Sequence, residues 1–232
     1  MSGILPFPPF RAAILDMDGL TLDTEPTYCH AWRLAAREFG FDLSDDYCQR
    51  LFGCHSDDVE LAMREVMGKA YHRELFFQSA EQHWRQYLDR HGLACMPGLK
   101  ELLSWLRHST IPYALATNSI SPYAEECLQR SGVAAEFSVV VTRNQVPRGK
   151  PAPDIFLEAA SRLATPPEFC LALEDSETGL AAARVAGTTP ILIQRRQVLR
   201  QKLGPLALCS FASLYDLLEV LQAQSYFSDS GC

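Results

Sequence analysis

Two carboxylates that directly follow a short apolar run are the first residues in this chain whose types and spacing could carry chemistry. The run covers residues 12–15, and Asp16, Asp18 and Gly19 come after it. A strand end holds carboxylates in place, glycine lets the chain turn away, and paired carboxylates suit a hard cation with an anion beside it. The same residues also fit an ordinary turn, because aspartate and glycine favour turns. The pattern therefore needs partners elsewhere in the chain.

A second pair of acids follows another apolar run. Residues 169–173 are followed by Glu174, Asp175 and Ser176. Magnesium prefers oxygen ligands, so this pair predicts metal ligands. Asp175 and Ser176 alone would also fit the start of a helix. Two carboxylates beside a buried strand are costly without a cation, which favours the metal site.

A lysine and a short polar segment complete the set of reactive groups. Lys150 stands between a glycine and a proline, which fix the backbone and leave one ammonium free to neutralise a phosphoryl oxygen and a nucleophile. Thr117 and Asn118 follow the apolar run 113–116 and offer a hydroxyl and an amide. Taken singly, these residues also fit a surface lysine and a common turn.

Alternating strand and helix patterns supply the elements that must position these groups. Strands are predicted at residues 12–15, 112–116, 137–142, 169–173 and 189–193. Such alternation predicts a parallel sheet with helices on both faces. Ligands bind beyond the carboxyl ends of the strands in such a sheet, so we expect the reactive groups to converge there.

A long helical segment, residues 26–91, interrupts this alternation. Its apolar residues recur at helical spacing. Pro26 is expected to begin a first helix, Ser44 and Ser56 to cap two more, and residues 71–90 to form a longer one. The predicted domains are a core, residues 1–24 with 95–232, and an all-helical insertion, residues 25–94.

The last part of the chain carries a basic segment, which we expect to be a solvated loop. The basic residues are Arg195, Arg196, Arg200 and Lys202. An amphipathic helix is expected at residues 211–221 and a disordered end at 225–232.

Ser121, which precedes a proline, is expected to cap the helix that follows the second strand. The positive end of that helix would then point toward the reactive groups.

Composition narrows the class of protein. The 232 residues carry a formal net charge of -7, which argues against a sequence-independent grip on nucleic acid. The eight cysteines form no Cys-x-x-Cys pair, so neither a zinc site nor a disulfide framework is indicated. There is no signal-peptide pattern and no apolar run of the ~20 residues that a membrane span needs, so we expect a cytoplasmic protein without a membrane partner. The sequence does not indicate the oligomeric state.

The four motifs together resemble those of the haloacid dehalogenase (HAD) superfamily. The resemblance covers residues 12–193. It implies a Rossmann-like parallel sheet as the HAD core, with an inserted all-helical cap domain like that of small-sugar phosphatases, phosphoglycolate phosphatase and beta-phosphoglucomutase. The matching motifs are Asp16-Met17-Asp18-Gly19-Leu20-Thr21-Leu22-Asp23-Thr24, Thr117-Asn118-Ser119, Lys150-Pro151-Ala152-Pro153-Asp154 and Glu174-Asp175.

The resemblance also implies roles for these residues. Asp16 would be the nucleophile that forms an aspartyl phosphate, and Asp18 would be the general acid and base. Lys150, Thr117 and Asn118 would bind the phosphate of the substrate. The expected function is that of a magnesium-dependent phosphatase acting on a small phosphorylated metabolite, most simply a sugar phosphate. Its Mg2+ would be held by the Asp16 carboxylate, the Asp18 carbonyl, Asp175 and Glu174.

Other members of the superfamily are alternatives. Haloacid dehalogenases lack an acid at the position of Asp18, and phosphonoacetaldehyde hydrolases need a cap lysine, for which only Lys69 is present. Beta-phosphoglucomutase shares the core and differs in the cap, where it has an arginine after a glycine and a hinge histidine. This chain has the loop 53–57 and Tyr28 at those places. A non-catalytic binding protein is disfavoured because the acids and the lysine are all present.

Overall fold

A computed structural model describes residues 7–51 and 56–229. The chain divides into two compact units, one made of Met1–Thr21 with Cys95–Cys232 and the other of Leu22–Ala94.

The first unit is built on a six-stranded parallel sheet in the order β3-β2-β1-β4-β5-β6. The predicted parallel α/β sheet is thus confirmed. Consecutive strands are joined through helices, as parallel pairing requires. The strands are β1 (Ala12–Leu15), β2 (Tyr113–Ala116), β3 (Val140–Val141), β4 (Cys170–Glu174), β5 (Thr189–Ile193) and β6 (Cys209–Phe211).

The register of the three central strands brings their carboxyl ends to one level. Leu15, the last residue of β1, pairs with Leu115 of β2 and with Leu173 of β4. The residues that follow these positions therefore emerge side by side at one edge of the sheet. This register places the reactive groups of the first unit.

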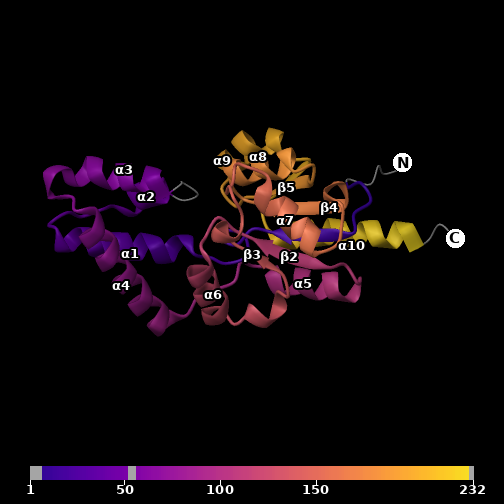
Figure 1. The fold of residues 1–232 in the computed structure, drawn as a ribbon, viewed down its shortest axis with the longest axis horizontal. Coiled ribbons are helices and arrows are strands. Elements are labelled where there is room, and N and C mark those ends of the chain that lie inside the picture. The colour runs from indigo at the N-terminus through magenta and orange to yellow at the C-terminus, as the bar shows by residue number, and fades with distance from the viewer. Residues whose placement is uncertain (1–6, 52–55, 230–232) are drawn as a thin grey trace. The chain divides into compact units, whose positions relative to one another are not determined.

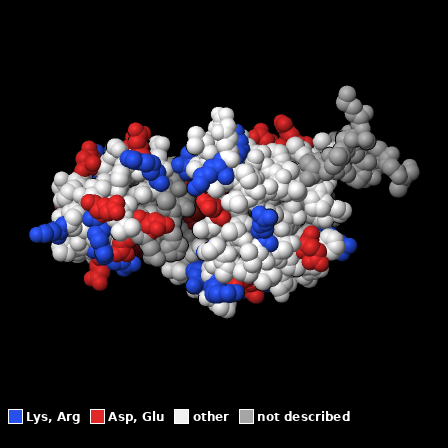
Figure 2. Space-filling model, turned by 90° about the horizontal axis from the view of Figure 1, so that it is seen from above, with Lys and Arg blue, Asp and Glu red and all other residues white. Residues whose placement is uncertain are grey.

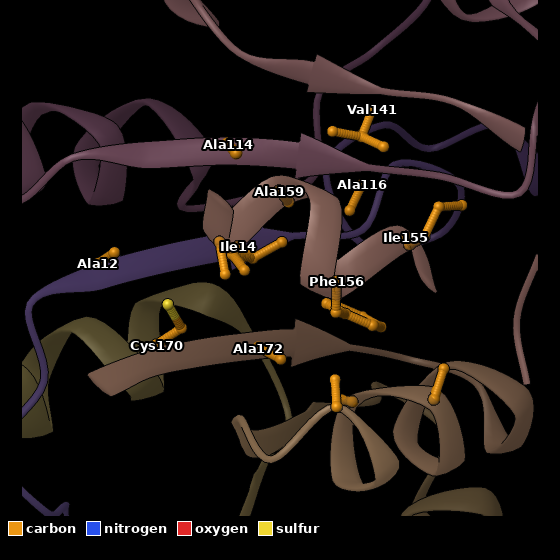
Figure 3. Packing of buried hydrophobic residues seen from close by; sticks show 14 of the residues in the cluster. Ala12, Ile14, Ala114, Ala116, Val141, Ile155, Phe156, Ala159, Cys170 and Ala172 are labelled. Atoms are coloured by element: carbon orange, nitrogen blue, oxygen red, sulfur yellow. The ribbon is translucent and has the colours of Figure 1, made fainter. Parts of the chain in front are cut away.

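Helices cover the sheet, and α7 packs on one face of its centre. Ile155 and Phe156 of α7 are fully buried against Ile14 of β1 and the alanines of β2 (Figure 3). Small strand residues such as Ala114 let α7 approach closely. The helices of this unit are α5 (Leu99–His108), α6 (Ser121–Arg130), α7 (Asp154–Arg162), α8 (Glu177–Val185), α9 (Gln197–Leu203) and α10 (Leu214–Asp229) (Figure 1).

Strands β3 and β6 differ most from the prediction, whereas β2 and β4 differ from their predicted bounds by a single residue at one or both ends. Strand β3 is shorter than the expected 137–142, because only Val140 and Val141 pair with β2 at that edge of the sheet. Strand β6 has no counterpart in the prediction. It is three residues long and none of its residues is fully buried, so it lacks the apolar pattern that marks the other strands.

The C-terminal segment is more regular than expected. The predicted solvated loop at the basic residues is wrong in part, because α9 begins at Gln197 and buries Leu203 against Leu180 and Leu192. Helix α10 (Leu214–Asp229) begins later than the predicted residue 211. Residues 225–229, expected to be disordered, belong to this helix.

Ser121 does not cap α6 as predicted. Ile120 occupies the cap position, and Ser121 is the first helical residue. The Ser121 hydroxyl instead contacts Asn144 Oδ1 at 3.0 Å and Thr142 Oγ1 at 2.8 Å. The first turn of α6 is therefore tied to the segment after β3.

The regular elements described in the second unit are helices. Phe76 and Met63 are fully buried at its centre, and Ser44 caps α2 by accepting a hydrogen bond from the Tyr47 backbone at 3.1 Å, as predicted. Helix α3 as described begins at Ser56, and residues 52–55, which include most of the loop compared with beta-phosphoglucomutase, lie outside the described residues. The helices are α1 (Glu25–Glu38), α2 (Asp45–Gln49), α3 (Ser56–Met67) and α4 (Arg73–His91), with a 3-10 turn at Gly68–Ala70.

Charged side chains of both signs are interspersed over the face of the molecule shown in Figure 2. Several exposed charged residues form i,i+4 pairs, such as Arg85 with Glu81 and Arg162 with Glu158. Exposed pairs of this kind contribute about 0–1 kcal/mol each. Among the helices of residues 7–51 and 56–229, none combines the length and the apolar character that a membrane crossing requires.

Candidate active site

Asp16 is the first residue after β1 and is 7% exposed. Its backbone N–H donates to the Leu173 carbonyl at 3.0 Å, and its own carbonyl accepts a hydrogen bond from the Thr21 hydroxyl. These backbone contacts fix the main chain where β1 ends. The carboxylate consequently projects from a rigid strand end.

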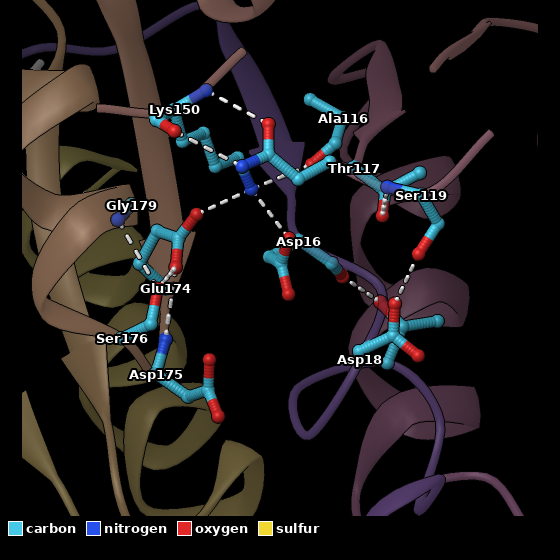
Figure 4. Close-up of polar contacts among 12 residues, drawn as sticks. Asp16, Asp18, Ala116, Thr117, Ser119, Lys150, Glu174, Asp175, Ser176 and Gly179 are labelled. Atoms are coloured by element: carbon cyan, nitrogen blue, oxygen red, sulfur yellow. Dashed lines mark hydrogen bonds and ion pairs between the residues drawn. The ribbon is translucent and has the colours of Figure 1, made fainter. Parts of the chain in front are cut away.

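Lys150 extends its ammonium into the same place from a different segment (Figure 4). Its Nζ contacts the Asp16 carboxylate, Glu174 Oε1 at 2.6 Å and the Ala116 carbonyl at 2.9 Å. Burial of the side chain favours the neutral amine, but Asp16 and Glu174 outweigh burial and raise the pKa of Lys150. The residue is therefore a buried cation shared between two carboxylates.

Asn118 fixes the backbone of Lys150. Its Oδ1 accepts from the Lys150 N–H at 2.7 Å, and its Nδ2 donates to the Lys150 carbonyl at 3.1 Å. A Cβ at Gly149 would collide with Asn118 Oδ1 and with the Arg143 side chain, which explains the glycine before the lysine. Thr117 is buried beside Asn118, and its hydroxyl accepts from the Ser119 backbone at 3.0 Å.

Glu174 is fully buried at the end of β4. Besides the Lys150 contact, its Oε2 accepts from the Asp175 N–H at 3.2 Å and from the Ser176 hydroxyl at 3.0 Å. Burial raises the pKa of the Glu174 carboxyl to about 7, and the Lys150 ammonium opposes that shift. A Cβ at Gly179 would overlap the carboxyl group, so α8 begins against it.

The carboxylates of Asp16, Glu174 and Asp175 form a cluster whose ligand oxygens lie within 4.8 Å of one another. All three residues are buried, and Lys150 supplies one positive charge against three carboxylates. Buried like charges at this separation repel each other unless a cation or protons compensate them. The donor set consists of oxygen, which suits Mg2+ or a similar hard divalent cation. The residues present thus fit such an ion.

Asp18 is half-buried and points its carboxylate toward β2 and α6. Its Oδ2 accepts from Ser119 Oγ at 2.8 Å, and its Oδ1 accepts from the Tyr123 hydroxyl at 3.0 Å. Sequence reasoning selected Asp18 but neither of these donors. Ser119 belongs to the polar motif after β2, so the sequence offered a signal for it. Tyr123 carries no such signal, because its contact with Asp18 depends on the direction of the first turn of α6.

Gln194 is a further buried polar residue that sequence reasoning did not select. It follows β5, and its Nε2 donates to the Asp175 carbonyl at 3.2 Å while its Oε1 accepts from the Arg196 N–H at 3.1 Å. A glutamine after the last apolar residue of a predicted strand was its only sequence signal. Gln194 holds the loop that carries Asp175.

The structure brings the predicted residues of four segments to one edge of the sheet. Lys150 contacts Asp16 and Glu174 directly, Asn118 holds Lys150, and Asp175 shares the carboxylate cluster. Fold and site together define a doubly wound α/β protein whose candidate site lies beyond the carboxyl ends of a parallel sheet.

Comparisons with known proteins identify the family. A model of the family described as haloacid dehalogenase-like hydrolase matches residues 13–193. The phosphorylated carbohydrates phosphatase of Thermotoga maritima is 33% identical over 177 residues, which cover 76% of this chain and 82% of that protein. The beta-phosphoglucomutase of Bacillus subtilis is 31% identical over 184 residues, which cover 76% of this chain and 80% of that protein.

A solved structure shows the same fold. The haloacid dehalogenase-like protein of unknown function from Agrobacterium tumefaciens superposes with a TM-score of 0.78 at 24% identity, over 93% of this chain and 99% of that one. With the match over residues 13–193, this chain belongs to the haloacid dehalogenase-like hydrolase family, and the resemblance stated from its motifs is confirmed.

Proposed function

We propose that this protein is a magnesium-dependent phosphatase that hydrolyses a small phosphorylated metabolite, of the sugar-phosphate type, through an aspartyl phosphate. The observation that carries this proposal is the Asp16 carboxylate in contact with the Lys150 ammonium at the end of β1, with a second carboxyl group at Asp18. A nucleophile, a cation and a proton donor are groups that suit cleavage of a phosphate ester through a covalent intermediate.

In the first proposed step, the Asp16 carboxylate attacks phosphorus and the bond between phosphorus and the ester oxygen breaks. Asp18 in its protonated form donates its proton to that oxygen, so the product leaves as an alcohol. The phosphoryl group is then joined to Asp16. An alkoxide without this proton is a poor leaving group, which is why the second acid favours phosphate esters over carbon–halogen substrates.

In the second step, water hydrolyses the aspartyl phosphate. The Asp18 carboxylate takes a proton from the water, whose oxygen attacks phosphorus, and the bond to Asp16 breaks. Inorganic phosphate is released, and Asp16 and Asp18 return to their starting forms. Dividing one displacement into two lowers the barrier of each.

The remaining residues would bind charge around the transferring group. Lys150 would neutralise the charge of a phosphoryl oxygen and of the nucleophile, and the Thr117 hydroxyl would donate a hydrogen bond to the phosphate. Asn118 holds Lys150 and has a second N–H to offer to the phosphate. The ion would be held by Asp16, the Asp18 carbonyl, Glu174 and Asp175. When bound, Mg2+ supplies positive charge that allows an anionic nucleophile and an anionic substrate to meet.

The helical segment is proposed to be the cap that selects the substrate. In this proposal the core domain comprises residues 1–24 and 95–232, and the cap comprises residues 25–94. Support comes from the division of the chain into compact units close to these bounds and from the helical elements of the second unit. Caps of this kind commonly close over a site to exclude water.

The test is phosphate release from a panel of sugar phosphates and other phosphorylated metabolites, with and without Mg2+. Activity is expected on at least one sugar phosphate, and it should disappear in Asp16→Asn and on chelation of the metal. Asp216→Asn, at an exposed helix cap, serves as the matched control and should keep its activity. Phosphate release that persists in Asp16→Asn would contradict the nucleophile, and release that ignores Mg2+ would contradict the metal.

A sugar phosphomutase is the second proposal, and the similarity to a beta-phosphoglucomutase supports it. A mutase would return the phosphoryl group to a second hydroxyl of the sugar instead of to water. The test is incubation with a hexose 1-phosphate, followed by separate measurement of hexose 6-phosphate and inorganic phosphate. Isomerisation faster than phosphate release would favour the mutase, whereas release alone supports the phosphatase.

A further inference from the structure

Tyr123 contacts the carboxyl group that the proposed mechanism uses as acid and base. Its hydroxyl donates to Asp18 Oδ1 at 3.0 Å, while Ser119 Oγ donates to Oδ2 at 2.8 Å. We infer that Tyr123, with Ser119, is a positioning residue that holds the Asp18 carboxyl in the orientation needed for proton transfer. The inference rests on the proposed phosphatase function and assigns the residues that make its acid effective.

Tyr123 is itself held in place. It lies in the first turn of α6, and two later residues of this helix, Ala124 and Cys127, are fully buried. The N–H and the hydroxyl of Ser121 both donate to Asn144 Oδ1, at 2.9 and 3.0 Å, which fixes the start of the helix. A side chain on a fixed helix turn is a more precise support than one on a loop.

Asp18 needs such support because it lies in the turn after β1 and is only half-buried. A general acid must come within about 2.6–3.2 Å of the atom that takes its proton. Two donors on different oxygens restrict rotation of the carboxyl group more than one donor does. Each oxygen keeps an acceptor site when Asp18 is protonated, so both hydrogen bonds are possible in both proposed steps.

The donors and Asp18 all belong to the first unit of the molecule. Asp18 lies two residues after β1, and Ser119 and Tyr123 follow β2, its direct neighbour in the sheet. The pairing of these two strands therefore sets the distance between acid and donors. The support for the acid is built into the core.

The first experiment compares Tyr123→Phe with Tyr215→Phe on a sugar phosphate in the presence of Mg2+. Tyr215 is the matched control, because its hydroxyl also donates to a carboxylate of the same unit, Glu101, at 3.2 Å. Tyr123→Phe is expected to lower kcat by about 10-fold or more, a part of the ~10²–10⁴-fold that a positioned acid or base contributes, with little change in KM. Thermal unfolding of both variants checks that they are folded.

The second experiment uses p-nitrophenyl phosphate, whose leaving group departs without a proton. In Tyr123→Phe the first step should keep its rate, so a rapid burst of p-nitrophenolate is expected, followed by slow turnover because water attack still needs the base. Loss of the burst in proportion to kcat would overturn the inference, because a purely structural defect lowers both steps.

The third experiment repeats the burst and turnover measurements in an Asp18→Asn background. If Tyr123 acts through Asp18, adding Tyr123→Phe should have no further effect there. A further loss similar to that in the wild-type background would overturn the inference. The proposed function is judged separately by Asp16→Asn: if that variant is inactive while Tyr123→Phe behaves like Tyr215→Phe, the phosphatase stands and the positioning role fails.

Discussion

Lys150 is a buried cation whose charge depends on two carboxylates from different strands. Its side chain is 3% exposed, and that of Glu174 is 0% exposed. Removing one member of a buried ion pair leaves an uncompensated charge. The loss of folding stability is then larger than the stability that the intact pair contributes. The contacts of Lys150 thus bear on stability as well as on the proposed binding of phosphate.

Lys150→Met is expected to destabilise the metal-free protein by about 3–5 kcal/mol at neutral pH. The measurement is urea unfolding in EDTA. Lys202→Met is the control, because Lys202 is exposed and its pair with Glu177 at 3.3 Å is worth less than about 1 kcal/mol. An equal, small effect of the two substitutions would contradict the account of the buried pair.

The stability of Lys150→Met is also expected to depend on pH. Burial already raises the pKa of Glu174 to about 7, and loss of the Lys150 ammonium removes the main opposing effect, so the pKa rises further. The folded variant then binds a proton that the unfolded chain has released, and its stability falls as pH rises. The loss of unfolding free energy in Lys150→Met relative to the wild type should therefore be larger at about pH 8 than at about pH 5. A loss that becomes smaller from about pH 5 to about pH 8 would contradict the burial of Glu174.

At the scale of elements, the start of α8 is built around one carboxyl group. Ser176 caps the helix by accepting from the Gly179 N–H at 3.1 Å and also donates to Glu174 Oε2 at 3.0 Å. Gly179 has no Cβ, and a Cβ there would overlap the Glu174 carboxyl group. The glycine lets the first helical turn lie directly against the end of β4.

Gly179→Ala is therefore expected to destabilise the protein and to lower phosphatase activity, although alanine favours a helix over glycine by about 1 kcal/mol. Displacement of Glu174 would also move Lys150. Gly204→Ala is the matched control, since a Cβ there would meet only the Ser210 hydroxyl, at 3.7 Å. Urea unfolding and phosphate release measure both variants, and a Gly179→Ala protein as stable as Gly204→Ala would refute the close approach.

The sequence allowed prediction of the elements with strong apolar patterns and not of those that tertiary contacts create. Strand β5 has its predicted bounds, Thr189–Ile193, because its last three residues form an apolar run that the structure buries. Strand β6 has three residues with no such run and pairs with β5 at the edge of the sheet. Ser121 was assigned as a cap from its type, but its hydroxyl found partners after β3, far away in sequence.

At the scale of the whole molecule, the polar groups of the site could be predicted because they follow strands of one parallel sheet. Asp16 and Glu174 needed only the rule that such strands end at the same edge, whereas Lys150 was selected from its place between a glycine and a proline and from the resemblance of its motif. Tyr123 and Gln194 could not be predicted, since their places depend on how α6 is oriented and on how the segment after β5 folds back toward Asp175. Strand order is recorded in sequence patterns, whereas helix orientation is decided by packing.

Because acids cluster at one edge of the sheet, we expect the stability of the whole protein to depend on a divalent ion. A ligand that binds only the folded state stabilises it by about 2.7 kcal/mol when its concentration is 100 times its Kd. Mg2+ is therefore expected to raise the thermal unfolding temperature of the wild type relative to EDTA. Asp175→Asn should lose this increase and, in EDTA, should be at least as stable as the wild type, because one of three mutually repelling carboxylates is gone. Asp216→Asn, whose carboxylate caps α10, should keep the full increase. A full increase in Asp175→Asn as well would place the ion elsewhere.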